Sequence, residues 1–408
     1  MACHAHSSSG SGLTKKCEWN DKISGAEKSA TRDINHTIPA QKTELTMKRI
    51  LKKHVTWMAS VIALLCLAAG CATQSRTARK TYYFFPPPPD EPRLQYLTGF
   101  SSEEAFGGGE KRTFMSYVTG EVPPDKGISK PYGVAAHDKK LYICDTDVGA
   151  VLVVDLQRKL IGILNTQGEG ALSTPLNITI DTDGSSYIAD SGRDQIVIFD
   201  KDGNFAGALG KAGKTQPRDV AVNATRIYVA DMKQHSVHVF DKASHNLLFD
   251  IPRANEKTNY VTTLFMPTNL ALDSKGRLYA ADTSGCRVQV YDTDGKYLRS
   301  VGALGDSPGY FARVKGVAVD RDNRLYAVDA LSGVVQIFDD KGHVLTWFGD
   351  PEAGGPLRSL PAKVLVDYDD VGLFQSYAAP HFKIEYLVVV INQLGAHKVT
   401  VYGFGHMK

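Results

Sequence analysis

The sequence predicts an all-β fold, a six-bladed β-propeller built from four-stranded antiparallel blades. A similar unit recurs six times, at intervals of about forty to fifty residues. Each unit contains short runs rich in β-branched and aromatic residues, separated by Asp-Gly, Lys-Gly and Asn turn signals, and such runs are typical of strands. Repeats of this length with four strands each indicate propeller blades, which bury their faces against neighbouring blades.

Each unit has the same internal order. It begins with an apolar strand, continues with a strand that ends in Asp in five of the six units, and adds a third apolar strand. The first strands are expected to begin at Pro131, Pro175, Pro217, Pro267, Val314 and Pro361. A fourth strand follows in most units, for example Phe205–Leu209 and Val344–Phe348. The sixth unit carries an insertion of roughly residues 368–385 and ends with Val399–Tyr402.

The sixth unit lacks a fourth strand of its own. Upstream of the first unit, Arg93–Phe100 resembles the fourth strand of the other units. We expect this N-terminal strand to pair with Val399–Tyr402 and to close the ring. Closure removes the exposed sheet edges that an open array would present.

The repeats resemble NHL repeats over roughly residues 93–404. Two segments carry the resemblance, Val317–Asp329 and Gly285–Gly295. The first contains an apolar strand, a turn and a strand that begins at Tyr326 and ends in Asp329. The resemblance implies an NHL-type six-bladed propeller. Function does not follow from it, because one propeller scaffold serves enzymes, receptors and adaptors.

A signal for membrane attachment precedes the repeats. Met47–His54 is basic, Val55–Leu67 is an uncharged apolar stretch, and Leu67–Cys71 is rich in small residues and ends in Cys. Residues 47–70 therefore resemble a bacterial lipoprotein signal peptide. The resemblance implies that Cys71 becomes the lipid-bearing first residue of the mature chain. An uncleaved signal anchor is the alternative, but the apolar stretch is shorter than the ~20 residues that span a bilayer comfortably.

The predicted signal peptide determines how the segments on either side of it are interpreted. Residues 1–46 are polar and lie in front of the signal, so we interpret them as a non-native or disordered extension before a start at Met47. Residues 71–92 form a Pro-rich tether, whose proline run favours an extended spacer. Docking of Tyr82–Phe85 on the side of the propeller is the alternative.

The predicted lipid places the protein in a bacterial cell envelope, facing the periplasm or the cell surface. We expect the outer membrane, because Ala72 follows the lipid Cys where Asp would favour retention at the inner membrane. Ten of the 47 basic and five of the 44 acidic residues lie in residues 1–71, so the mature chain has a net charge of −2. This balance predicts no nucleic-acid partner, and a monomeric propeller is expected.

A recurring Asp at the end of the second strand invites a ring-of-carboxylates hypothesis. A structural role is favoured, because an Asp at a strand turn accepts backbone N–H bonds and every unit needs the same turn. The residues concerned are Asp145, Asp190, Asp231, Asp282 and Asp329.

The units differ at the residues that follow the leading Pro or Val. These residues begin the innermost strands and are expected to ring one mouth of the central channel. The polar ones are Asn177, Arg218, Asp219, Asn269, Lys315 and Lys363. Their mixed charge suits a small anionic ligand or a peptide carboxylate, and a hydrated entrance without a ligand is the alternative.

Catalytic chemistry is not indicated. Some relatives of this architecture are lyases acting on hydroxyglycine-ended peptides, and they hold a catalytic zinc with histidines from separate inner strands. Here the predicted inner strands contain His137, whereas a zinc site needs three or four convergent ligands. No catalytic residue, metal ligand or cofactor is predicted, and binding of a calcium or zinc ion in the channel is left as an open alternative.

The sequence therefore favours a lipid-anchored, non-catalytic propeller that binds or scaffolds a protein or peptide partner in the cell envelope. A metal-dependent lyase or hydrolase and a small-molecule receptor at the channel mouth are the alternatives. The long connections 101–127, 250–266 and 368–385 are candidate contact loops. They contain aromatic residues suited to interface anchoring or to packing over the blades: Phe106, Phe114, Tyr117, Tyr260, Phe265, Phe374, Tyr377 and Phe382.

Overall fold

The computed structural model describes residues 47, 49, 51–62, 81–109, 126–253, 259–352 and 359–408. The chain divides into two compact units, Met1–Arg79 and Lys80–Lys408. In the first unit residues 51–62 are helical, and no helix in the described part of the chain is long and apolar enough to cross a membrane. Cys71, its cleavage site and residues 1–46 lie outside the described residues, so those expectations stay predictions.

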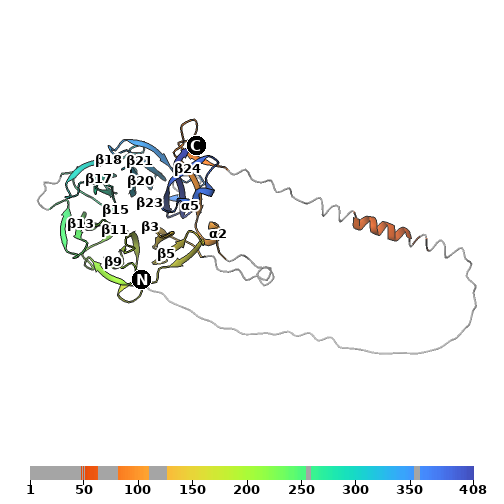
Figure 1. Cartoon of the computed structure of the whole chain (residues 1–408), viewed down its shortest axis with the longest axis horizontal. Helices are drawn as coiled ribbons and strands as arrows, with labels where there is room; N and C mark the ends of the chain where they lie inside the picture. The colour runs from red at the N-terminus through yellow and green to blue at the C-terminus, as the bar shows by residue number, and fades with distance from the viewer. Residues whose placement is uncertain are drawn as a thin grey trace, which may run out of the picture. The chain divides into compact units, whose positions relative to one another are not determined.

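The second unit is a ring of six antiparallel sheets, which confirms the predicted six-bladed propeller (Figure 1). Blade 1 contains β3 (Pro131–His137), β4 (Lys140–Asp145), β5 (Ala150–Asp155) and β6 (Leu160–Ile163). Blade 2 contains β7 (Pro175–Ile180), β8 (Ser186–Asp190), β9 (Gln195–Phe199) and β10 (Phe205–Leu209). Blade 3 contains β11 (Pro217–Val222), β12 (Arg226–Asp231), β13 (Ser236–Asp241) and β14 (Leu247–Ile251).

Blades 4 and 5 follow the same pattern. Blade 4 contains β15 (Pro267–Leu272), β16 (Leu278–Asp282), β17 (Arg287–Tyr291) and β18 (Tyr297–Val301). Blade 5 contains β19 (Val314–Val319), β20 (Leu325–Asp329), β21 (Val334–Phe338) and β22 (Val344–Phe348). The first strand of each blade is innermost and contacts the first strands of both neighbouring blades.

Blade 6 closes the ring as predicted. It contains β23 (Pro361–Asp367), β24 (Phe382–Asn392) and β25 (Val399–Met407), followed outward by β2 (Leu94–Phe100) and β1 (Tyr83–Phe85). β2 pairs with β25 from Leu94 opposite Phe404 to Phe100 opposite Val399. The fifth strand β1 pairs with β2, so Tyr83–Phe85 docks on the propeller, which was the alternative to a free spacer for this part of the tether.

The insertion in the sixth unit is shorter than the sequence suggested. Residues 382–386 belong to β24, and their side chains alternate between buried and exposed, the pattern of a half-buried strand. The rest of the insertion forms the short helices α5 (Val371–Phe374) and η2 (Gln375–Tyr377). Two further short helices, α2 (Glu103–Phe106) and η1 (Gly168–Gly170), lie in the connections outside blade 6 and between blades 1 and 2.

Turn chemistry explains why each hairpin forms where it does. Between β9 and β10, the Asp200 carboxylate accepts the N–H groups of Asp202 and Asn204, and Gly203 takes a left-handed backbone with φ 81°. Glycine adopts this conformation without steric cost. The Asp-Gly and Lys-Gly signals of the sequence therefore correspond to real turns.

The hydrophobic core lies between blades rather than within any one of them. Each of the six apolar clusters joins two adjacent blades. Cys144 and Val151 of blade 1, for example, pack against Ile178 and Ile188 of blade 2. Burial of such a side chain contributes about 1.5–3 kcal/mol, so every blade depends on its neighbours and the ring is a rigid frame for the residues at its centre.

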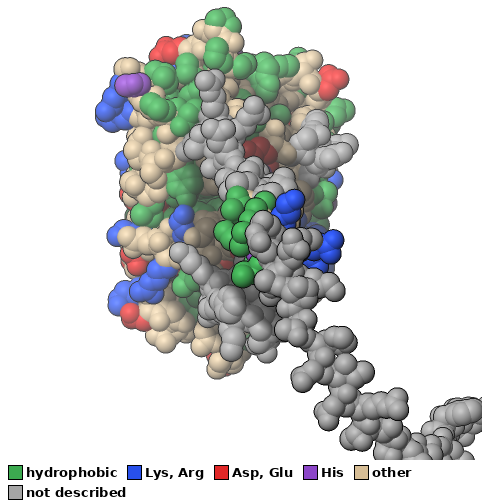
Figure 2. Space-filling model, turned by 90° about the vertical axis from the view of Figure 1, so that its right-hand side faces the viewer, with side chains coloured by type: hydrophobic (Ala, Val, Ile, Leu, Met, Phe, Trp, Pro, Cys, Tyr) green, Lys and Arg blue, Asp and Glu red, His purple; other side chains and the backbone are tan. Residues whose placement is uncertain are grey.

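In the view of Figure 2, basic and acidic side chains are interspersed with hydrophobic and uncharged ones over the described residues.

Several of the aromatic residues proposed for partner contact belong to the hydrophobic core: Phe106, Phe374 and Phe382 are buried in the cluster between blades 1 and 6. Phe114 and Tyr117 lie outside the described residues.

Candidate functional site

A β-bulge shapes the channel mouth. Each inner strand shows a register shift directly after its first residue, for example between Pro217 and Asp219. A bulge leaves extra residues unpaired and re-aims their side chains. The shift falls on the residues at which the sequence predicted polar diversity, so the repeated backbone irregularity is what presents these side chains around the channel.

The inner strands approach one another closely at the mouth. A Cβ added to Gly133 of blade 1 would lie 2.5 Å from the Asn177 Cα of blade 2. Likewise, a Cβ on Gly316 of blade 5 would lie 2.6 Å from the Lys363 Cα of blade 6. Any larger residue at these two positions would push neighbouring blades apart. The inner strands of these neighbouring blades therefore pack closely where they begin.

Three of the six predicted mouth residues form an internal brace across the ring. The Lys363 ammonium of blade 6 donates to the Asp219 Oδ2 of the opposite blade 3 at 2.7 Å and to the Asn269 Oδ1 of blade 4 at 2.5 Å. All three side chains are buried. Burial raises the pKa of Asp219, and the Lys363 ammonium opposes this rise. The brace thus joins blade 6 to blades 3 and 4, and because these groups satisfy one another, they offer no free charge to a ligand.

The other charged residues of the mouth remain without a counter-ion. Arg218 of blade 3 and Lys315 of blade 5 make no ion pair with any described residue, and neither do Lys130 and Arg313, which immediately precede β3 and β19. Burial, together with the positive charges of Arg313, Arg218 and Lys130, lowers the pKa of Lys315 to about 8. These four residues, Lys130, Arg218, Arg313 and Lys315, are called the basic rim below.

Neutral groups place the Lys315 ammonium. It lies 4.9 Å from the centre of the Tyr132 ring and donates to the Gln393 Oε1 at 3.0 Å. Burial raises the pKa of Tyr132, so its phenol stays neutral. Lys315 is therefore held in a fixed position by an aromatic face and an amide, neither of which removes its charge.

Two buried polar atoms at the mouth lack hydrogen-bond partners. The Arg218 Nε has no acceptor, and the Asn177 Oδ1 has no donor. The Asn177 Nδ2 donates to the Arg218 carbonyl at 2.8 Å, which fixes the two residues relative to each other. Leaving such groups unpaired costs about 1–3 kcal/mol each, and a bound polar ligand would recover part of that cost.

The recurring Asp residues hold the loops that enter the mouth. Asp145, Asp190, Asp231, Asp282 and Asp329 are all buried, and each accepts main-chain N–H bonds from the one or two residues before its blade's inner strand. Asp145 thereby binds the Lys130 N–H at 3.1 Å, and Asp329 binds the Arg313 N–H at 2.9 Å. The carboxylates act as turn acceptors and fix the backbone of two rim residues.

Blade 3 departs from this pattern. Its Asp231 also contacts the Nε2 of His238 at 3.2 Å, and the His238 Nδ1 lies 2.6 Å from the Asp250 Oδ1. Burial lowers the pKa of His238, but the two carboxylates outweigh this effect and the pKa is raised overall.

No metal centre stands out in the described residues. No three or more His, Cys, Asp or Glu side chains among them gather in a way that could hold a metal ion. His137, at the end of β3, is exposed.

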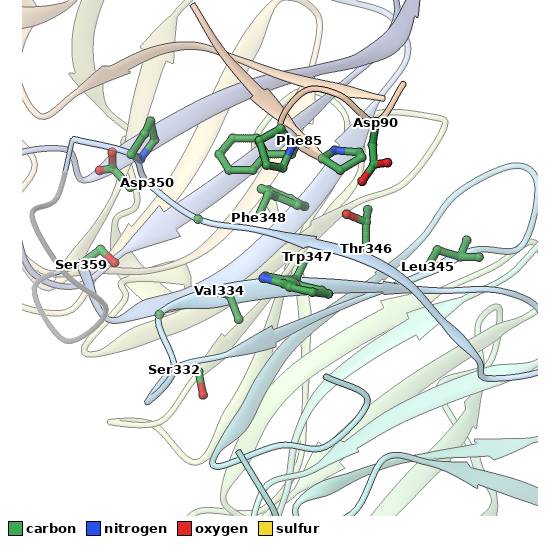
Figure 3. A pocket seen from close by; sticks show the side chains of 15 residues that line it. Phe85, Asp90, Ser332, Val334, Leu345, Thr346, Trp347, Phe348, Asp350 and Ser359 are labelled. Atoms are coloured by element: carbon green, nitrogen blue, oxygen red, sulfur yellow. The ribbon is translucent and has the colours of Figure 1, made fainter. Parts of the chain in front are cut away.

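A second concavity lies on the side of the molecule. A groove of about 730 Å³ runs between β22 and the turn after β1, and Figure 3 shows Phe85 facing Phe348, with Trp347 on the other side of the strand. Its lining is largely apolar, and its charged groups, Asp90 and Asp350, are acidic. An anionic ligand is therefore disfavoured here, in contrast to the basic rim.

Sequence reasoning missed part of the rim. Lys130 and Arg313 were not assigned to the site, and neither was Gln393, which accepts a hydrogen bond from Lys315. The signal for Lys130 and Arg313 was present, because each stands directly before the first residue of an inner strand, where the other units have Thr, Gln, Met and Leu. Gln393 follows β24 and carries no such positional cue.

Comparisons with known proteins agree with the fold class. A family model described as a 6-bladed beta-propeller matches residues 263–344. Protein brain tumor of Drosophila melanogaster is 25% identical over 142 residues, which cover 33% of this chain and 13% of that protein. The chain thus spans a small part of the length of this curated relative.

Solved structures show the same architecture at low identity. A protein of unknown function from Bacteroides thetaiotaomicron has a TM-score of 0.51 and 16% identity, over 76% of this chain and 75% of that one. Virginiamycin B lyase from Staphylococcus aureus with quinupristin has a TM-score of 0.48 and 13% identity, over 68% and 96% of the two chains. A gluconolactonase from Xanthomonas campestris has a TM-score of 0.48 and 16% identity, over 80% and 99%. The six sheets of the structure and the family model define a six-bladed β-propeller, and the likeness to the Bacteroides protein extends to the fold alone.

Proposed function

We propose that this protein is a non-catalytic binding propeller that captures a carboxylate-bearing peptide or protein partner at the basic rim. The observation that carries the proposal is the unmatched charge of Arg218 and Lys315, with the buried Arg218 Nε left without an acceptor. The positive charges of Arg313, Arg218 and Lys130 help to lower the pKa of Lys315, and a bound anion relieves this repulsion.

A carboxylate fits the site better than a diffuse negative surface does. The Lys363–Asp219 contact joins opposite blades at the centre of the ring, and inner strands of neighbouring blades pack closely where they begin. A small planar anion reaches Arg218 and Lys315 there, and guanidinium groups bind carboxylates bidentately. The exposed Lys130 and Arg313 are then free to contact a second acidic group of the same partner or to steer its approach.

The rim test compares a short peptide that ends in a free carboxylate with the same peptide bearing a C-terminal amide. We expect the whole chain to bind the free acid at least tenfold more tightly, about 1.4 kcal/mol. Arg218→Gln and Lys315→Gln should each weaken binding of the acid without affecting the amide. Isothermal titration calorimetry at low and moderate salt measures both, and the affinity should fall with salt.

Lys341→Gln is the matched control. Lys341 is exposed and lies in the turn between β21 and β22, at the opposite end of the strands from the mouth. The Lys341→Gln substitution should therefore leave peptide binding unchanged. Equal affinity for the acid and the amide, or full binding by Arg218→Gln, would refute the proposal. Preference for an inorganic phosphate over the carboxylate would refute the choice of ligand.

We further propose that the protein is lipid-anchored through Cys71 in a bacterial cell envelope, with the outer membrane favoured. The basic Met47–His54, the apolar Val55–Leu67 and the small residues before Cys71 support this. We expect a membrane-bound mature chain whose mass equals residues 71–408 plus acyl chains, and Cys71→Ser should abolish both processing and acylation. Mass spectrometry of membrane fractions checks this, and an unprocessed wild-type chain would point to the signal-anchor alternative.

A further inference from the structure

The outer strand of blade 5, β22, has a free edge. It is the last strand of its sheet and pairs with β21 on its inner side. Among the described residues, no backbone hydrogen bond joins β22 to an element other than β21. The neighbouring β1 belongs to the sheet of blade 6. A free strand edge presents a row of N–H and C=O groups to which another extended chain can bind.

The groove on the side of the molecule follows this edge. Four consecutive residues of β22 line it, Leu345, Thr346, Trp347 and Phe348. Successive side chains of a strand point to opposite faces, and Figure 3 shows Phe348 and Trp347 on opposite sides of the strand. A cavity lined by both faces of one strand lies along the edge of that strand. The groove therefore gives access to the backbone of β22 between two rows of side chains.

The turn after β1 forms the opposite wall of the groove. Phe85, Pro86 and Pro87 line this wall, and the Phe85 ring lies 6.2 Å from the Phe348 ring. Proline has no backbone N–H, so this wall offers apolar surface rather than a ladder for pairing. The neighbouring β1 shows that the propeller accepts an added outer strand, because it pairs with the outer edge of β2 in blade 6.

Two apolar side chains of β22 are left open to solvent. Leu345 is 54% exposed and Trp347 is 51% exposed. They stand two positions apart and therefore share one face of the strand. Side chains on the same face of paired strands contact one another, so a strand added at this edge would cover both residues if its own apolar residues alternated.

The charge of the groove favours a basic partner. Its charged residues are Asp90 and Asp350. The Asp350 Oδ2 already lies 3.2 Å from the His397 Nδ1, and this contact raises the pKa of His397. Asp90 is exposed and forms no ion pair with a described residue. A lysine or arginine in the groove would thus find an unmatched carboxylate at Asp90.

We propose that a basic, extended segment of a protein partner adds to blade 5 as a fifth strand along β22. Its backbone pairs with the outer edge of β22, its alternate apolar side chains pack on Leu345 and Trp347, and a basic side chain contacts Asp90. Main-chain hydrogen bonds give such strand addition its affinity, and the alternate side chains give it specificity. None of the four basic-rim residues lines this groove, so the inference does not depend on the function proposed for the mouth.

A phage-displayed library of short random peptides, panned against the whole chain, supplies the probe. Enriched peptides are synthesised with an acetylated N-terminus and an amidated C-terminus, so that no terminal carboxylate can bind the basic rim. We expect alternating apolar residues with a lysine or arginine among them. Calorimetry should show binding at least about tenfold weaker for Leu345→Ala and for Trp347→Ala, and a smaller loss for Asp90→Asn.

Methylation of the peptide's backbone nitrogens tests strand pairing itself. Methyl groups on alternate residues should abolish binding in the pattern whose N–H groups face β22 and spare it in the other pattern, because alternate N–H groups of a strand point to opposite edges. Leu298→Ala is the matched control in the protein. Leu298 has in β18 of blade 4 the position that Leu345 has in β22, and it is 43% exposed, so its loss should leave binding intact.

Circular dichroism establishes that the variants are folded. The proposal is overturned if panning enriches no peptide, if both methylation patterns bind alike, or if Leu345→Ala and Trp347→Ala bind as tightly as the wild type. Peptides whose binding is lost in Arg218→Gln would occupy the basic rim and would also overturn it. A dimer of the whole chain in sedimentation that Trp347→Ala dissociates would show that the groove binds a second copy of the chain, which overturns the choice of partner.

Discussion

At the residue scale, one position in the third strand of blades 3, 4 and 5 carries a polar side chain that makes contacts at the end of the blade. In blades 4 and 5 this position is Gln289 and Gln336, whose amides donate to the carbonyl groups of Thr263 and Tyr310 in the loop before the inner strand. In blade 3 it is His238, which bridges Asp231 and Asp250 instead. Blade 3 thus has an ionisable imidazole at the position where blades 4 and 5 have a neutral amide.

His238→Gln should remove a pH-dependent part of the stability. The folded-state pKa of His238 lies above its ordinary value, so its charge stabilises the fold fully below about pH 6.5 and this contribution is lost as the pH rises through the raised pKa. Hydrogen bonds to charged groups contribute about 1.5–3 kcal/mol, so the variant should be less stable by about that amount at pH 5.5.

The free energy of unfolding, measured in urea for both proteins at pH 5.5 and pH 8.5, checks this. The difference between wild type and His238→Gln should shrink at the higher pH. A difference of the same size at both values would mean that the imidazole acts by packing alone.

At the scale of the element, β2 completes the ring from the N-terminal end of the propeller. It pairs with β25, and its Leu94 is fully buried between blades 5 and 6 with Val335 and Phe348. The Pro-led strands and Asp turns were predictable because they repeat. The pairing of β2 was predictable because the sixth unit lacked one strand. The fifth strand β1 was not, because an isolated Tyr83–Phe85 becomes a strand through contacts with distant residues such as Phe348 and Phe382.

Leu94→Ala should weaken the closure. Removing a fully buried Leu side chain from a core costs about 2–5 kcal/mol. Leu298→Ala, the same change on the outer strand β18 where the side chain is 43% exposed, should cost clearly less. Urea unfolding of the two variants compares them, and equal losses would show that the closing strand adds no special stability.

At the scale of the whole molecule, the ring brings together residues that the sequence keeps far apart. Repeats predicted the six blades and the six residues that begin their inner strands. They did not predict which of these residues neutralise one another, because the Lys363–Asp219 contact depends on the width of the channel and joins blades on opposite sides of the ring.

The strand β1 has a mechanical consequence. β1 pairs with β2 through three residue pairs, whereas β2 pairs with β25 through six. A pulling force applied at Thr81, the N-terminal end of the described propeller, would load Tyr83 opposite Tyr96 first and peel β1 away one pair at a time. β1 is therefore expected to separate first under tension, while β2 stays paired with β25 and the ring stays closed.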